Sequence, residues 1–152
     1  MKLSDLIRQP QFESEAHRAL LNVMATSSWI TGELAATMAP FEVTPAQYNV
    51  LRILRGTHPD RLSCTAIGER LLDRTPDVTR LLNRLQRAGL VHRARAKEDR
   101  RMVQVGITEA GLDLLCRMEQ PVRAFSERLS EHLTPDEQAL LNDLLERLRT
   151  DQ

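Results

Sequence analysis

The sequence predicts a mainly α-helical protein with one small β-hairpin. Apolar residues recur at i, i+3, i+4 and i+7 through most of the chain, which is the period of an amphipathic helix. Only residues 90 to 107 change to the alternation that is typical of strands. Aromatic residues make up 3% of the chain, and a composition dominated by Leu, Ala, Glu and Arg also favours helices.

The chain has the length of a single domain with its own core, at 152 residues. No apolar run reaches the roughly 20 residues that cross a bilayer, and the first twelve residues lack the apolar centre of a signal peptide. We therefore expect a cytoplasmic protein. Cys64 and Cys116 lie far apart without CxxC spacing, so we expect no disulfide framework, no metal site and no cofactor.

The charge is balanced in number but not in position, with 21 basic and 21 acidic residues. Residues 70 to 101 contain ten basic and four acidic residues, a net charge of +6, and the remainder of the chain carries −6. A neutral total therefore conceals a molecule with one basic face.

The first long helix is predicted from residue 13 to residue 38, after a loose N-terminal arm. Its length of roughly 39 Å, at 1.5 Å per residue, exceeds the diameter of a small domain, so part of its apolar face needs a partner outside the domain. The spacing of that face is close to a heptad seam. The seam consists of Ala16, Leu20, Val23, Ser27, Ile30, Leu34 and Met38.

Two shorter helices follow. The first is predicted to begin at Thr44, which forms a capping box with Gln47, and to stop at Gly56. The second covers residues 64 to 71, with Ser63 as its cap.

A third short helix, residues 75 to 88, has Thr75 as its predicted cap, Pro76 in its first turn and Gly89 after its end. One face is apolar and the other is polar and basic. The apolar face holds Val78, Leu81, Leu82 and Leu85, and the polar face holds Thr79, Arg80, Asn83, Arg84 and Arg87.

The predicted hairpin pairs residues 90 to 95 with residues 102 to 107 across the charged loop AKEDRR. Alternation places Val103, Val105 and Ile107 inward, and Met102, Gln104 and Gly106 outward.

Two further helices are predicted, from Thr108 to Leu133 with a kink at Pro121, and from Thr134 onward with Glu137 completing a capping box. The second is rich in leucine. Thr-Pro pairs thus open three predicted helices, at Thr44, Thr75 and Thr134.

The basic helix is the strongest functional signal. No carboxylate lies four residues before or after Arg80, Arg84 or Arg87, whereas solvated helices usually intersperse such partners. A solvated charged surface is the alternative, but arginine and asparagine on one helix face suit guanine and adenine in the DNA major groove. The predicted DNA-contacting residues of this helix are Thr75, Thr79, Arg80, Asn83, Arg84 and Arg87.

The hairpin strengthens this interpretation. A short helix, a turn, a basic helix and a basic hairpin together form a winged helix-turn-helix. The hairpin residues expected at the DNA backbone or minor groove are Arg95, Lys97, Arg100 and Arg101.

From about residue 13 to residue 149 the chain resembles the MarR family of bacterial transcription regulators. The resemblance rests on VTPAQYNVLRIL, on TPDVTRLLNRLQRAGLVHRARAKEDRRMVQVGITEAG and on the long helices at both ends. Its most specific part is D-x-R followed by alternating apolar residues and T-x-x-G. The matching residues are Asp99, Arg101, Val103, Val105, Ile107, Thr108 and Gly111.

The resemblance implies one MarR-type domain over residues 1 to 152. About 13–38 and 108–150 would be dimerisation helices, and about 44–107 the DNA-binding lobe. It implies a homodimer on a pseudo-palindromic DNA operator, with Arg101 in the minor groove and Asp99 orienting nearby arginines. Gly106 and Pro76 depart from the family pattern.

The resemblance also implies a repressor that a small aromatic or phenolic ligand releases. The implied pocket residues are Met24, Thr26, Trp29 and Arg52. The alternative signal is thiol oxidation, for which Cys64 is favoured over Cys116.

Two other classes of protein compete with this prediction. An enzyme is disfavoured because the four histidines are scattered and no HExxH, phosphate-binding glycine loop or G-x-S-x-G is present. A helical interaction adaptor would explain the terminal helices but would leave the basic helix and hairpin without a role.

Overall fold

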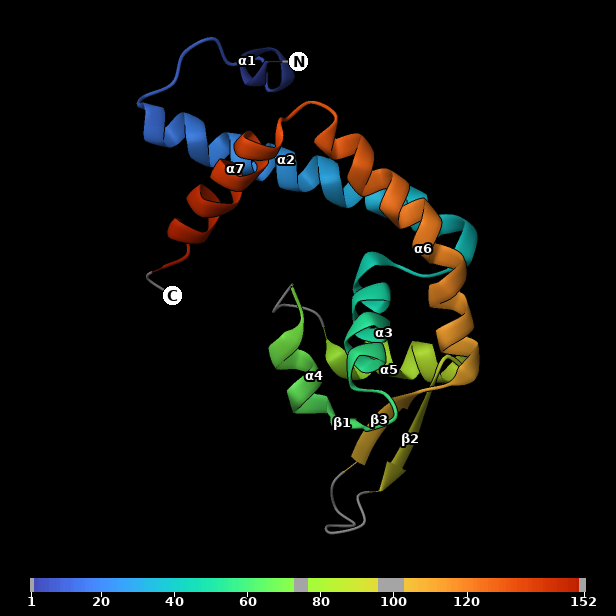
Figure 1. The fold of residues 1–152 in the computed structure, drawn as a ribbon. Coiled ribbons are helices and arrows are strands. Elements are labelled where there is room, and N and C mark those ends of the chain that lie inside the picture. The colour runs from blue at the N-terminus through green and yellow to red at the C-terminus, as the bar shows by residue number, and fades with distance from the viewer. Residues whose placement is uncertain (1, 73–76, 96–102, 151–152) are drawn as a thin grey trace.

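A computed structural model describes residues 2–72, 77–95 and 103–150. The helices and strands form a lobe that carries the sheet, and helical arms that extend from it (Figure 1). In chain order the elements are α1 (Leu3–Leu6), α2 (Glu15–Met38), the 3-10 turn η1 (Ala39–Phe41), α3 (Pro45–Thr57), β1 (Leu62–Ser63), α4 (Cys64–Arg70), α5 (Val78–Arg87), β2 (Val91–Arg95), β3 (Val103–Ile107), α6 (Glu109–Ser130) and α7 (Pro135–Arg147).

Both expected capping boxes are present. The Thr44 hydroxyl accepts from Gln47 N at 3.2 Å, and the Gln47 side chain accepts from Thr44 N at 2.9 Å. At the start of α7 the same exchange joins Thr134 and Glu137. The hydrogen bond from the Thr134 backbone N–H lowers the pKa of Glu137 below its ordinary value.

The predicted cap of the basic helix is wrong. The N-cap of α5 is Asp77, whose carboxylate accepts from Arg80 N at 3.1 Å. The reason is that Asp77 is itself a strong capping residue, and it stands three positions before that free amide. Thr75 and Pro76 lie outside the described residues.

The C-terminal end of α5 is as predicted. Gly89 adopts a left-handed conformation with φ of +71°. Its N–H donates to Gln86 O and the N–H of Leu90 donates to Leu85 O, both at 3.0 Å, which is the Schellman arrangement. Gly56, in contrast, does not stop α3, which continues through Thr57.

The predicted hairpin is confirmed, and the structure adds a strand. β2 and β3 are antiparallel, and β1 pairs with the other edge of β3 to give the order β1-β3-β2. The two residues of β1 are too few to show a period in the sequence. The loop between β2 and β3 lies outside the described residues.

The burial of two residues in β3 differs from the expectation. Gly106 is buried, because it lies opposite His92, whose ring covers it: a Cβ on Gly106 would stand 2.7 Å from His92 Cε1. Val103 is 42% exposed because it pairs with Arg95 at the end of the strands beyond the core, whereas Val105 and Ile107 are buried as expected.

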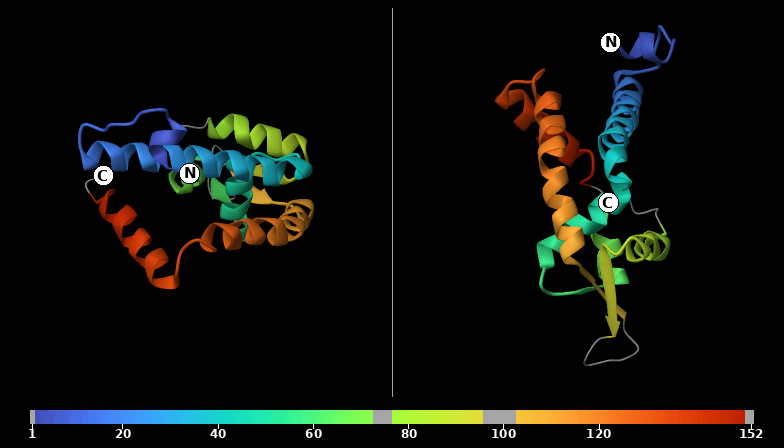
Figure 2. Two further views of the ribbon diagram at one scale, coloured as in Figure 1. Left: turned by 90° about the horizontal axis from the view of Figure 1, so that it is seen from above. Right: turned by 90° about the vertical axis from the view of Figure 1, so that its right-hand side faces the viewer.

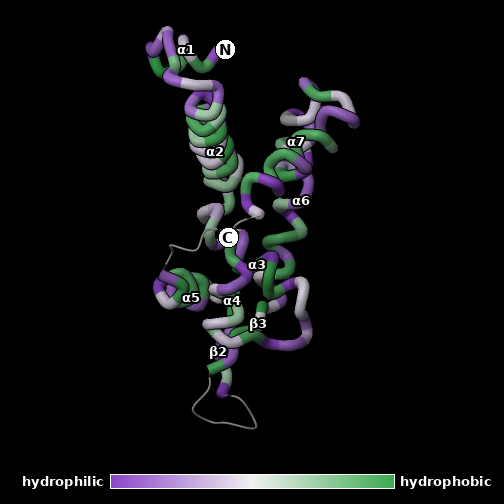
Figure 3. The backbone as a smooth tube through the Cα atoms, turned by 90° about the vertical axis from the view of Figure 1, so that its left-hand side faces the viewer, coloured by the Kyte–Doolittle hydropathy of each residue, from purple (hydrophilic) through white to green (hydrophobic). Residues whose placement is uncertain are grey.

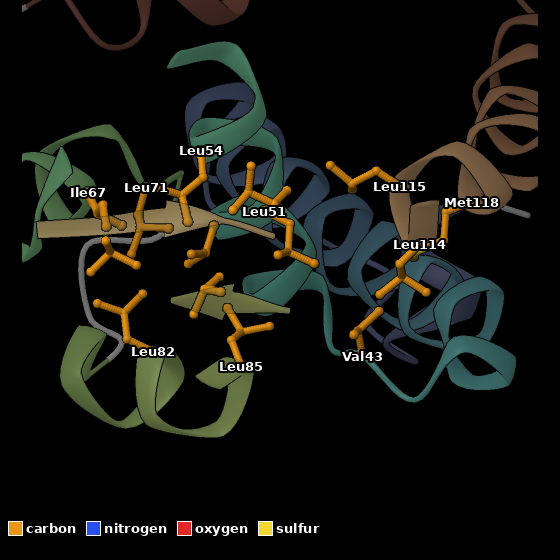
Figure 4. Close-up of a cluster of buried hydrophobic side chains, with 14 of the residues drawn as sticks. Val43, Leu51, Leu54, Ile67, Leu71, Leu82, Leu85, Leu114, Leu115 and Met118 are labelled. Atoms are coloured by element: carbon orange, nitrogen blue, oxygen red, sulfur yellow. The ribbon is translucent and has the colours of Figure 1, made fainter. Parts of the chain in front are cut away.

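The core of the lobe joins α3, α4, α5 and the sheet. Figure 4 shows Leu82 and Leu85 of α5 pointing toward the strands and toward the Leu51 and Leu54 side of α3. All four leucines are fully buried. The core continues to the first half of α6, which contributes Leu114, Leu115 and Met118.

The helical arms bury much less. α2 and the C-terminal half of α6 extend away from the lobe (Figures 2 and 3). An ion pair joins these two helices, between Arg128 of α6 and Glu33 of α2, at 2.7 Å. Pro121 lies inside α6, which changes direction along its length (Figure 1). No described helix is long and apolar enough to cross a membrane.

The arm expected to be loose contains the short helix α1, whose Leu3 is buried. Large apolar side chains remain exposed on the other arm helices, and α7 has no buried residue. The exposed residues of α2 and α7 are Leu20, Val23, Met24, Trp29, Leu140, Leu141 and Leu144.

We expect Leu85→Ala to lower the free energy of unfolding by about 2 to 5 kcal/mol, because it leaves a cavity where α5 meets the sheet. Leu72 is 91% exposed, so Leu72→Ala is the matched control and should change stability by less than about 0.5 kcal/mol. Urea unfolding followed by circular dichroism measures both. Equal effects of the two substitutions would contradict this packing.

Candidate nucleic-acid interface

The helix α5 presents a polar face because its apolar face is anchored in the core. Leu82 and Leu85 are fully buried, and Val78 and Leu81 are half-buried. The residues of the opposite face are all exposed, and one of them, Gln86, was not singled out from the sequence although its helical phase places it there. The exposed face consists of Thr79, Arg80, Asn83, Arg84, Gln86 and Arg87.

The orientation of α5 is fixed at both ends. Asp77 caps its first turn and the Gly89 arrangement closes its last. At the start of α5, Val78 lies so close to α4 that a Cβ on Gly68 would stand 3.3 Å from Val78 Cγ2. A side chain on a rigid helix is positioned more precisely than one on a loop, which suits recognition of base edges.

The arginines of α5 have no internal counter-charge among the described residues. The five ion pairs found in that part of the chain involve His17, Arg18, Arg123, Arg128 and Arg147. The Asp77 carboxylate accepts from the backbone of Arg80. Three guanidinium groups therefore face outward on one short helix, and this arrangement favours a polyanionic partner.

The hairpin adds basic residues beside this helix. Arg95 is exposed at the end of β2, and Arg93 is half-buried two residues earlier. The hairpin extends from the lobe on the side away from α2 and α7 (Figure 1). The other predicted hairpin contacts, Lys97, Asp99, Arg100 and Arg101, lie outside the described residues.

The predicted pocket residues are only partly brought together. Thr26 and Trp29 line a cavity of about 310 Å³ between α1 and α2, with Leu3, Leu6, Asn22 and Ala25. Met24 does not line this cavity. Arg52 lies on α3, where its guanidinium donates to the Tyr48 hydroxyl at 3.2 Å. The contribution of α1 to this cavity was not predicted from the sequence, because a helix of four residues is too short to show a helical period.

The two cysteines have different surroundings. Cys64 is half-buried at the first position of α4 and packs against the core, whereas Cys116 is exposed on α6. In the part of the chain that the structure describes, no cluster of His, Cys, Asp and Glu side chains forms a metal site.

Comparison with known proteins places this geometry among transcription regulators. Residues 41–102 match the family model of the MarR family. A MarR transcription factor from Planctomyces limnophilus is 40% identical, with 90% of this chain and 98% of that chain covered and a TM-score of 0.69.

Two further relatives connect the fold to DNA. A cysteine-to-serine variant of MarR from Escherichia coli, solved in complex with operator DNA, is 26% identical with a TM-score of 0.80, covering 91% of this chain and 98% of that one. The transcriptional repressor IacR from Pseudomonas putida is 28% identical over 116 residues, 76% of this chain and 68% of that protein.

The structure contains a winged helix-turn-helix with a basic helix, and the relatives that it matches are transcription regulators. Both observations identify a regulator rather than an enzyme. The protein belongs to the MarR family of DNA-binding transcription regulators.

Proposed function

We propose that this protein is a homodimeric repressor that recognises a pseudo-palindromic operator in double-stranded DNA. The observation that carries the proposal is the exposed face of α5, where three arginines have no carboxylate partner among the described residues. Operator phosphates and base edges supply the missing acceptors. Blocking a promoter requires only tight occupancy, and IacR, one of the relatives, is named a repressor.

The proposed DNA contacts are of two kinds, those that recognise base edges and those that hold the protein on the DNA backbone. Arg80, Asn83 and Arg84 lie on the exposed face and have the donors that bridge guanine or adenine edges in the major groove. Thr79, at one flank of that face, Arg87, in the last turn of α5, and Thr75, before the helix in sequence, contact phosphates. On the hairpin, Arg95, Lys97, Arg100 and Arg101 meet the backbone or minor groove, and Asp99 orients arginines.

The exposed apolar residues of α2 and α7 support a dimer. Leu140, Leu141 and Leu144 lie on consecutive turns of α7 and are 43% to 57% exposed, and such a contiguous patch is typical of a protein interface. A two-fold dimer would present two α5 helices about 34 to 36 Å apart, or a multiple of that distance. Residues 13–38 and 108–150 are the proposed dimerisation parts, and residues 44–107 the DNA-binding lobe.

The cavity between α1 and α2 supports a small aromatic effector. Its walls are mainly apolar, with Trp29 available for stacking and with Thr26 and Asn22 available for hydrogen bonds. Such a ligand changes operator affinity only if it binds one dimer geometry more tightly than the other. Oxidation of Cys64 is the second candidate signal, favoured by its position at the start of α4.

We expect Arg84→Ala to weaken operator binding by about 1 to 3 kcal/mol and to relax sequence preference, because it removes a base contact. Lys97→Ala should weaken binding to all duplexes similarly and flatten the salt dependence. Fluorescence anisotropy measures both, with the duplex upstream of the protein's own gene compared with a scrambled duplex at several salt concentrations.

Arg123→Ala is the control for these variants, since Arg123 lies on α6 and pairs with Glu127 at 3.9 Å. It should bind like the unchanged protein. Unchanged operator affinity of Arg84→Ala would refute the assignment of the reading face. Equal, weak binding of the unchanged protein to both duplexes would refute operator recognition and favour the interaction adaptor.

We expect Leu144→Glu to weaken dimerisation at least about tenfold, or about 1.4 kcal/mol, because it buries a carboxylate in the proposed interface. Sedimentation velocity over a range of concentrations measures the change. Leu72→Glu places the same charge on an exposed residue of the lobe and should leave the dimer intact. A Leu144→Glu protein as dimeric as the Leu72→Glu protein would place the interface elsewhere.

We expect a hydroxybenzoate to quench the fluorescence of Trp29, the only tryptophan of the chain, and to release the operator at the same concentrations. Trp29→Ala should raise the concentration needed for release about tenfold, because stacking is lost. Leu72→Ala is the control, since Leu72 lies in the lobe, outside both the cavity and the exposed apolar residues of α2 and α7. If Trp29→Ala releases the operator at the same hydroxybenzoate concentration as the unchanged protein, this effector site is refuted.

A further inference from the structure

We propose that Thr108 is a positioning residue for DNA reading, because it bonds the C-terminal end of α5 directly to the first turn of α6. Its hydroxyl donates to Gly89 O at 2.7 Å, and its backbone N–H donates to Leu90 O at 3.1 Å. The same hydroxyl accepts from Gly111 N at 3.1 Å. This inference rests on the proposed function, in which α5 is the reading helix.

The carbonyl groups that Thr108 engages lie where the chain leaves α5. The left-handed Gly89 turns the chain from the helix into β2, and carbonyl groups at a helix end need partners outside the helix. Thr108 supplies two donors to this turn from 19 residues farther along the chain. The backbone bond to Leu90 O extends the β2–β3 ladder by one residue, whereas the hydroxyl bond to Gly89 O is a tertiary contact beyond that ladder.

Gly111 allows the two helices to come this close. A Cβ at Gly111 would collide with Leu90 O and would stand 2.7 Å from Ile107 Cγ1, so no larger residue fits without a shift. The T-x-x-G pattern thus has two physical roles in this chain. Threonine makes the hydrogen bonds across the junction, and glycine removes the side chain that would separate its two sides.

The junction connects the two parts of the molecule. α6 continues from Thr108 to the arm, where Arg128 pairs with Glu33 of α2 at 2.7 Å. A rotation of α6 at the arm therefore changes the angle of α5 in the lobe, since the bonds at Thr108 hold the two helices together. Bidentate base contacts are lost when that angle changes, whereas contacts to phosphates tolerate it.

The alternative is that Thr108 acts only as the N-cap of α6. Substitutions at Thr108 distinguish this capping role from the positioning role. Thr108→Asp keeps an acceptor for Gly111 N, and aspartate is a good N-cap, but it has no proton to donate to Gly89 O. Thr108→Ser keeps both the donor and the acceptor. Thr44→Ala removes the threonine cap of α3 in the same lobe, whose hydroxyl accepts from Gln47 N within its own helix, and it is the control for lost capping.

The experiment is the anisotropy titration of the full-length variants on the operator duplex and on the scrambled duplex. We expect Thr108→Asp to lower the ratio of operator affinity to scrambled affinity about tenfold, with the scrambled affinity and the salt slope unchanged. Thr108→Ser should keep the ratio within about twofold of the unchanged protein, and Thr44→Ala should do the same.

If the ratio of operator affinity to scrambled affinity is the same for Thr108→Asp as for Thr44→Ala, the proposal is overturned, because Thr108 then acts only as a cap. If circular dichroism shows that Thr108→Asp does not fold, Thr108→Ala replaces it against the same control and must lower the ratio likewise. Unchanged protein that binds both duplexes equally would instead refute operator recognition, and with it the positioning role.

Discussion

The burial of one face of α5 is the constraint on which the rest of the lobe depends. Leu82 and Leu85 reach the centre of a core that α3, α4 and all three strands share, and their insertion leaves α5 only one rotation about its axis. That rotation places every arginine of the helix in solvent. The hydrophobic effect thus determines where the charges stand, although the charges contribute little to the fold themselves.

The sequence predicted what depends on local pattern. Apolar period located α2, α5 and α6, and capping chemistry located the starts of α3 and α7, because the residues that determine these features lie within one or two turns. The start of α5 was mispredicted because Thr75 and Asp77 are both good caps and a pattern cannot rank them. Among the candidate sites, the exposed face of α5 followed from its helical phase.

Features that depend on distant residues were not predictable in this way. β1 has two residues and exists only because β3 offers it a free edge. The burial of Gly106 depends on the ring of His92 in the neighbouring strand. Met24 and Arg52 were grouped with Trp29 by resemblance, but the cavity is closed by α1, and only the tertiary structure places α1 against α2.

Ser63 connects the two parts of the lobe that we propose to contact DNA, the hairpin and the helix-turn-helix. Its backbone pairs with Gln104 in β3, and its hydroxyl accepts from Ala66 N to cap α4. One residue of β1 thus both pairs with the hairpin strand β3 and caps α4, the first helix of the helix-turn-helix. In the proposed DNA complex, a displacement of β3 would therefore reach the first turn of α4, so that the contacts of the hairpin and those of the helix-turn-helix would depend on each other.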